Sequence, residues 1–208
     1  MVEKQGYHAL QGGLGSYEYA AFFDGNYHQP DPKKPVVFRL IKKLEADPLI
    51  AGRVHYKLAY DRAPYYYDLE KATLSRQIPK VGIKFGFTRS ESQQGQPFDW
   101  SWTVEGVNSN LRPTDDEFAQ MAPKEGYTSQ WQVSQSAKAE RFMQVAKTRL
   151  YTLTSDGRYA VVDLYYVQSN RRDSGPFLTV KSLLNPSGSR NLEYDPEKRI
   201  NHLAGPFP

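Results

Sequence analysis

The stretch 150–167, LYTLTSDGRYAVVDLYYV, decides the fold that this sequence encodes. Two runs rich in strand-forming residues flank a short polar turn that contains Asp156-Gly157. Glycine accepts the positive φ that a tight turn requires, so an Asp-Gly pair between two such runs predicts an antiparallel hairpin. The residues of this hairpin expected to enter the core are Leu153, Val161 and Tyr165.

The strand pattern continues on both sides of the hairpin. After a polar loop, residues 177–184 form another strand-like run, so three consecutive antiparallel strands are expected. Nearer the N-terminus, apolar and polar residues alternate in 53–60, 80–88 and 98–104. Alternation with a period of two puts one face of a strand in the core and the other in solvent, which is typical of antiparallel sheets. A further strand is expected at 17–23.

Three other segments are predicted to be helices, two from apolar residues at helical spacing and one from a capping signal. The segment 36–46 begins after a proline and ends before Asp47-Pro48, although a strand through Val36, Phe38 and Leu40 is the alternative. The segment 114–121 opens with the capping-box pair Thr114 and Glu117. The segment 134–147 has a stripe formed by Ala139, Phe142, Met143 and Ala146.

Together these patterns predict a mainly β (α+β) protein. We expect an antiparallel β-sandwich or curved sheet, with two or three short helices packed at its edge or on one face. With 208 residues, the chain has the length of one domain, and a single globular domain over 1–208 is expected. A glycine-rich segment over about 1–16 is expected to be flexible, and residues from about 185 to 208 to form an extended tail with little core of its own.

Composition sets limits on the class of protein. Lysine and arginine number 27 against 23 acidic residues, and no basic run exceeds two residues, so nucleic acid is an unlikely partner on sequence grounds. The absence of cysteine excludes disulfides, cysteine-zinc sites and thiol nucleophiles. No apolar run is long enough for a membrane span. An extracytoplasmic location, in the periplasm or at the cell surface after removal of a signal peptide, is favoured, while a cytoplasmic one stays open.

Tyrosine is abundant, with 15 residues, and three of them are consecutive: Tyr65, Tyr66 and Tyr67. Consecutive residues of a strand point to opposite faces, so at least one of these rings is expected to face outward. An exposed aromatic ring can stack on a sugar or on a partner surface. These three tyrosines are therefore the predicted ligand-binding residues, with simple packing as the competing interpretation.

Residues for other chemistry are scattered. The four histidines, His8, His28, His55 and His202, lack the close spacing of a zinc motif, and no nucleophile elbow is present, so no catalytic residue, metal site or cofactor is predicted. Asp68 and Glu70 would share one face of a strand, the arrangement a hydrolase with a carboxylate pair would need. Arg53, His55, Lys57 and Lys84 would lie on outward strand faces, but interspersed acids argue against a continuous basic groove.

The sequence thus favours a non-catalytic exported protein: a cell-envelope, surface or appendage component that acts by protein–protein interaction or self-assembly into an oligomer. A carbohydrate-binding module that uses the exposed tyrosines is one alternative, and a hydrolase is another. A protein partner or self-association is expected, and a glycan is the second candidate ligand.

Overall fold

The structure, a computed structural model, describes residues 4–9, 33, 40–59, 61, 63–91, 95–116, 118–169 and 175–200. Contacts divide the chain into two units, Met1–Glu45 and Ala46–Pro208. The predicted strand at 17–23 and most of the predicted flexible segment lie outside the described residues.

In the first unit, β1 (Tyr7–Ala9) pairs antiparallel with β2 (Leu40–Lys42). The amide of Lys43 extends the pairing by donating to the carbonyl of Gly6 at 2.9 Å. The predicted helix over 36–46 is therefore wrong for its described part, where Leu40 belongs to a strand, as in the alternative reading. A partner more than thirty positions earlier in the chain overrides the local apolar spacing.

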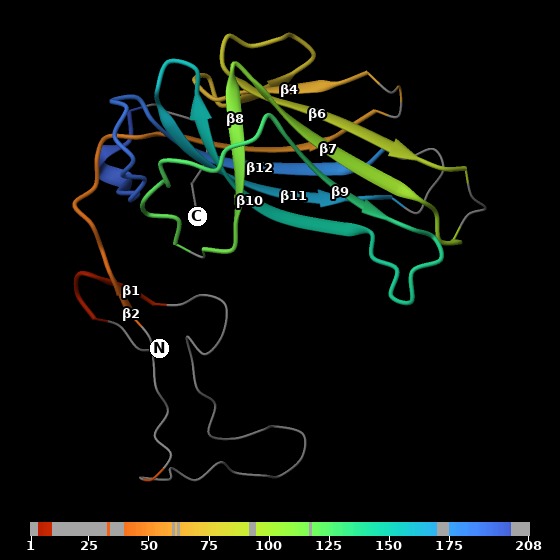
Figure 1. Cartoon of the computed structure of the whole chain (residues 1–208), viewed down its shortest axis with the longest axis horizontal. Helices are drawn as coiled ribbons and strands as arrows, with labels where there is room; N and C mark the ends of the chain where they lie inside the picture. The colour runs from red at the N-terminus through yellow and green to blue at the C-terminus, as the bar shows by residue number, and fades with distance from the viewer. Residues whose placement is uncertain are drawn as a thin grey trace. The chain divides into compact units, whose positions relative to one another are not determined.

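The second unit contains two five-stranded antiparallel sheets, which Figure 1 shows as two layers. The first sheet has the order β3–β12–β11–β10–β8, with bounds Ile50–Lys57, Phe177–Asn185, Tyr159–Val167, Val145–Thr154 and Ser109–Thr114. The second has the order β5–β4–β6–β7–β9, with bounds Thr73–Ser75, Tyr65–Asp68, Gly82–Arg89, Trp100–Val107 and Gln130–Gln135. The predicted antiparallel sandwich is confirmed.

One core lies between the two sheets. Trp102 of β7 is fully buried and stacks on Tyr166 of β11 with ring centroids 5.0 Å apart and an interplanar angle of 11°. The ring of Phe85, from β6, also packs on Trp102, with ring centroids 6.1 Å apart. The alternating residues predicted to face inward in 80–88 and 98–104 are buried here: Val81, Ile83, Phe85, Phe87, Phe98, Trp100, Trp102 and Val104.

The chain crosses from the second sheet to the first between β7 and β8. Asn108 has a positive φ of 48°, a conformation that asparagine tolerates better than most residues. Just before it, a Cβ on Gly106 would lie 1.9 Å from the carbonyl oxygen of Ser109, so only glycine fits this corner.

A second, smaller core lies on the outer face of the first sheet. Leu192, from the segment after β12, is 2% exposed and packs with Tyr151 and Val161, together with Ala119 and Ala122 from the segment after β8. This part of the tail contributes to a core, contrary to the sequence expectation. The covered area is confined to one end of the sheet.

The predicted helices at 114–121 and 134–147 are wrong. Within the described residues, the sole helix is a 3-10 turn, η1 (Pro196–Lys198). The Thr114 hydroxyl accepts the backbone N–H of Asp116, and the Asp116 carboxylate accepts that of Phe118. Both hydrogen bonds stabilise turns that follow β8, not the first turn of a helix. The helical spacing of Phe142 and Ala146 has another origin: Phe142 packs edge-on against Phe98 from a loop, and Ala146 is buried from within β10.

The hairpin is confirmed: β10 and β11 pair from Val145↔Val167 to Leu153↔Tyr159, and Gly157 has a φ of 85°. The predicted face of β11 is wrong for Tyr165, which is 45% exposed. Its neighbour Tyr166 occupies the core instead. Val161 is buried, but in the second core, and Leu153 is partly buried.

Candidate functional site

The three consecutive tyrosines occupy β4, and strand alternation sends them to opposite sides. Tyr67 is fully buried, its hydroxyl lies 2.7 Å from the hydroxyl of Ser182, and burial raises its pKa to about 12. Tyr65 is also buried: its hydroxyl accepts the amide of Ala59, and the Arg76 guanidinium lies 3.4 Å from its ring centroid. Tyr66 lies on the outer face, half-buried. The predicted binding triplet thus offers Tyr66 to an outside ligand.

The outer face of the second sheet is polar around Tyr66. By register, Tyr66 lies beside Lys84, which lies beside Glu105. The Lys84 ammonium donates to the Glu105 carboxylate at 2.8 Å, and this hydrogen bond raises the pKa of Lys84. A Cβ on Gly86 would have a single neighbouring atom within 4 Å, the Cβ of Thr103 at 3.9 Å, so an area of bare backbone lies open there.

An open groove of about 490 Å³ continues this face towards one end of the sheet. Polar residues from three separate segments line it: Thr88 to Ser90, Asp99 and Ser101, and Ser134 to Ser136. The hydroxyls of Thr88 and Ser101 lie 2.7 Å apart. The buried Trp100 also contributes to the lining, and its indole N–H donates to the carbonyl of Met143 at 3.0 Å.

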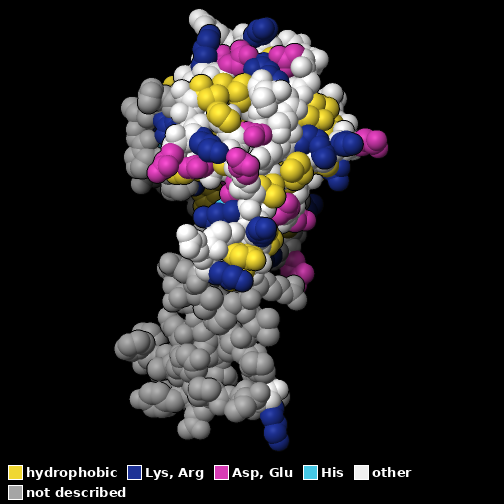
Figure 2. Space-filling view, turned by 90° about the vertical axis from the view of Figure 1, so that its left-hand side faces the viewer, with side chains coloured by type: hydrophobic (Ala, Val, Ile, Leu, Met, Phe, Trp, Pro, Cys, Tyr) yellow, Lys and Arg dark blue, Asp and Glu magenta, His cyan; other side chains and the backbone are white. Residues whose placement is uncertain are grey.

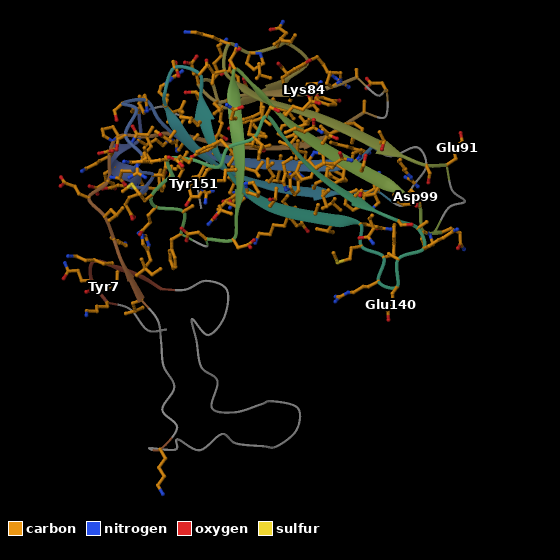
Figure 3. The ribbon with its side chains drawn as sticks, viewed as in Figure 1. Tyr7, Lys84, Glu91, Asp99, Glu140 and Tyr151 are labelled. Atoms are coloured by element: carbon orange, nitrogen blue, oxygen red, sulfur yellow. The ribbon has the colours of Figure 1, made fainter. Side chains whose placement is uncertain are left out.

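Asp99 lies at the mouth of the groove, at the end of the sandwich where Figure 3 labels Glu91, Asp99 and Glu140. Its Oδ1 accepts the amide of Ala137 at 2.8 Å and the hydroxyl of Ser136 at 3.2 Å. The groove therefore offers a carboxylate and several hydroxyls, which are groups that hydrogen-bond to polyhydroxylated ligands. Sequence reasoning missed it because its three segments are adjacent only through strand pairing.

The two acids considered as a carboxylate pair have separate structural partners. Asp68 Oδ1 accepts the amides of Glu70 and Lys71, both at 2.9 Å, and so stabilises the turn after β4. Glu70 accepts from the Arg158 guanidinium at 2.7 Å. These contacts account for both carboxylates without catalysis, so the structure adds no support for a hydrolase.

Two of the four histidines lie in the described residues. His8 is in β1, and His55 is in β3, where its Nδ1 lies 2.8 Å from the hydroxyl of Thr179. His28 and His202 lie outside the described residues. Across the residues that the structure describes, no group of three or more histidine, aspartate or glutamate side chains could hold a metal ion.

Comparison with known proteins gives no relative: no family model, curated protein or solved structure matches this chain. In the part of the chain that the structure describes, no helix has the length and apolar character needed to cross a bilayer.

Proposed function

We propose that this chain is a non-catalytic, exported protein that self-associates through an edge of its second sheet. The observation that carries the proposal is the character of β9, Gln130–Gln135, an edge strand with the sequence QWQVSQ. It contains no charged residue, no proline and no glycine. Soluble proteins normally protect a sheet edge with one of these devices or by keeping the strand short.

The other three edge strands of the two five-stranded sheets are each protected in one of these ways. β5 is only three residues long. β3 carries Arg53 and Lys57, and β8 carries Arg112 and Pro113. The contrast singles out β9 as the edge on which a second copy could add a strand, and two copies related by a twofold axis would extend the sheet antiparallel.

The hydrogen-bond phase of the ladder shows which backbone groups β9 would use. The amide of Gly106 donates to the carbonyl of Ser129 at 2.9 Å, which makes 106 and 129 a hydrogen-bonded pair. Such pairs alternate with non-hydrogen-bonded ones in an antiparallel ladder. Gln130, Gln132 and Ser134 therefore direct their backbone groups away from β7. The carbonyl of Gln130 accepts from the Thr128 hydroxyl at 3.0 Å, which leaves Gln132 and Ser134 facing the open edge.

This geometry supplies a sharp test, because Gln132→Pro removes an edge N–H without removing a hydrogen bond to β7. Sedimentation velocity over a range of concentrations is expected to show a dimer for the native chain. Gln132→Pro should weaken the dimer by about tenfold or more, or about 1.4 kcal/mol. Gln132→Ala, which keeps the N–H, is the matched control and should dimerise like the native chain.

A native chain that stays monomeric at every concentration would contradict the proposal, as would a Gln132→Pro variant that dimerises normally. Circular dichroism on each variant shows whether the fold is kept.

Carbohydrate binding is the second candidate, favoured by the hydroxyl-lined groove on the face that carries Tyr66. The ring of Tyr66 would stack on a sugar, and Asp99 with its neighbouring hydroxyls would hydrogen-bond to the sugar hydroxyls. Titration calorimetry against a panel of neutral oligosaccharides tests this. Tyr66→Ala is expected to reduce affinity roughly 5- to 10-fold, the equivalent of about 1–1.4 kcal/mol, and Tyr66→Phe to preserve most of it. Equal affinities for the Ala variant and the native chain would remove Tyr66 from the site.

A further inference from the structure

The outer face of the first sheet has an open half, at the end away from the second core. Strand register brings together there the residues that we call the basic face: Arg53, Lys57, Lys147, Tyr165, Phe177 and Lys181. Lys147 is the cross-strand neighbour of Tyr165, and Lys181 that of Arg53. Four strands contribute to the face, and no two of these six residues are adjacent in the sequence.

The basic face carries more positive than negative charge. The acid among the outward positions of these strands is Asp163, the cross-strand neighbour of Lys181, and its carboxylate is held by Arg149, whose Nη2 donates to Oδ2 at 2.9 Å. Within the described residues, none of the four cations of the basic face forms an ion pair. On the face of the molecule shown in Figure 2, by contrast, basic and acidic side chains are interspersed. The acids that are interspersed along the sequence therefore lie mostly elsewhere than on this face.

Aromatic rings lie among these cations. Tyr165 is 45% exposed and Phe177 is 37% exposed. The His55 ring stacks on Phe177 with centroids 5.7 Å apart and an interplanar angle of 9°, and the Lys57 ammonium lies 5.9 Å from the same ring. Tyr165 and Phe177 are diagonal cross-strand neighbours, a relation that separates residues by about 7–8 Å.

We propose that the basic face binds single-stranded nucleic acid. Exposed aromatic rings on a sheet, flanked by lysine and arginine, are the combination that binds unpaired bases and their phosphates together. Alternate residues along a β-strand are about 6.6–6.8 Å apart. Lysine and arginine side chains at this spacing can each contact a different phosphate of an extended nucleic-acid strand.

The rings distinguish this ligand from other polyanions. In a duplex the bases are stacked on one another, so Tyr165 and Phe177 would have no base to contact. An acidic peptide would neutralise the cations and leave both rings in water. A single-stranded nucleic acid would contact the cations through its phosphates and the rings through its bases. It is therefore the one of these ligands whose affinity should depend on Tyr165 as strongly as on the lysines.

Fluorescence anisotropy with a labelled oligothymidylate of about 12 nucleotides tests the proposal, using the full chain. With four phosphate contacts, the slope of log K against log salt should be about −3, or roughly a 50-fold loss between about 50 and 200 mM salt. Tyr165→Ala should weaken binding roughly 5- to 150-fold, the effect of one lost stacked base. Lys147→Gln with Lys181→Gln should reduce the slope by about 1.4.

Lys71→Gln is the control, since this side chain is 78% exposed in the turn after β4, on the other sheet, and it should bind like the native chain. Absence of binding at low salt overturns the proposal, as does a Tyr165→Ala variant that binds normally. Equal or tighter binding of a duplex, poly-L-glutamate or phosphatidylserine vesicles also overturns it. Self-association through β9 is measured separately and does not bear on the outcome.

Discussion

Single residues in the turn between β10 and β11 show how local chemistry fixes the hairpin. Gly157 takes the positive φ, and the residues beside it hold the turn through their side chains. Arg158 donates to Asp156 and also to Glu70, which lies in the turn after β4 of the other sheet. The Arg158 guanidinium and the Thr154 hydroxyl hold the pKa of Asp156 at about 2, below its usual 3.8. The charged form of Asp156 is therefore preferred in the folded state.

The turn should for this reason make stability depend on pH in a defined window. A carboxyl group with a lowered pKa adds stability above its unfolded pKa, and this contribution disappears as the pH falls towards the folded pKa. The difference in unfolding free energy between the native chain and Asp156→Asn should thus be largest above about pH 4 and shrink towards about pH 2. Urea unfolding at several pH values measures it. A difference that stays constant over this range would show that Asp156 acts through something other than its charge.

At the same scale, sequence could predict that a tyrosine of β11 is buried but not which one. Tyr165 and Tyr166 are adjacent, and both faces of this strand carry apolar residues because the second core covers part of the outer face. The alternation of apolar residues along β11 is therefore compatible with burial of either tyrosine. The contacts that decide it, Trp102 and Trp100 packing on Tyr166, come from the other sheet and cannot be read locally.

At the scale of elements, strands were predictable where one face is buried along their whole length. This holds for β6 and β7, whose inward residues alternate without interruption. The three predicted helices failed for different reasons. Over 36–46, pairing with β1 makes a strand of Leu40–Lys42. The Thr114 and Asp116 side chains cap turns rather than a helix, and in 134–147 a loop places Phe142 at helical spacing. The groove and the basic face could not be predicted, since each depends on the order and register of strands far apart in the sequence.

The segment after β12 gives an element-scale prediction. Leu192→Ala should reduce the free energy of unfolding by about 2–5 kcal/mol, because it removes a buried side chain that joins this segment to the outer face of the first sheet. Ile200→Ala is the matched control: Ile200 lies in the same segment and is 48% exposed, so its loss should cost about 0.5 kcal/mol or less. Thermal or denaturant unfolding compares the two. Similar losses for both variants would mean that Leu192 has no special role in anchoring the segment.

At the scale of the whole second unit, the two outer faces of the sandwich differ in chemistry. The second sheet presents hydroxyls, amides and the paired charges of Lys84 and Glu105, while the open half of the first sheet presents cations and aromatic rings. Lys84, which the sequence grouped with Arg53, His55 and Lys57, belongs to the second sheet. A single core thus lies between two outer surfaces of different chemistry, and the neutral edge strand β9 borders one of them.

The pairing of β3 with β12 also bears on how the polypeptide is made. β3 is the first strand of its sheet to leave the ribosome, yet its ladder partner is the last, with Val54 opposite Val180. Until translation reaches that point, β3 has no neighbour in the sheet, and the growing chain must keep it soluble. β3 carries an arginine, a histidine and a lysine. Charged side chains on an unpaired strand oppose its pairing with other chains, so these residues would reduce aggregation until β12 has been synthesised.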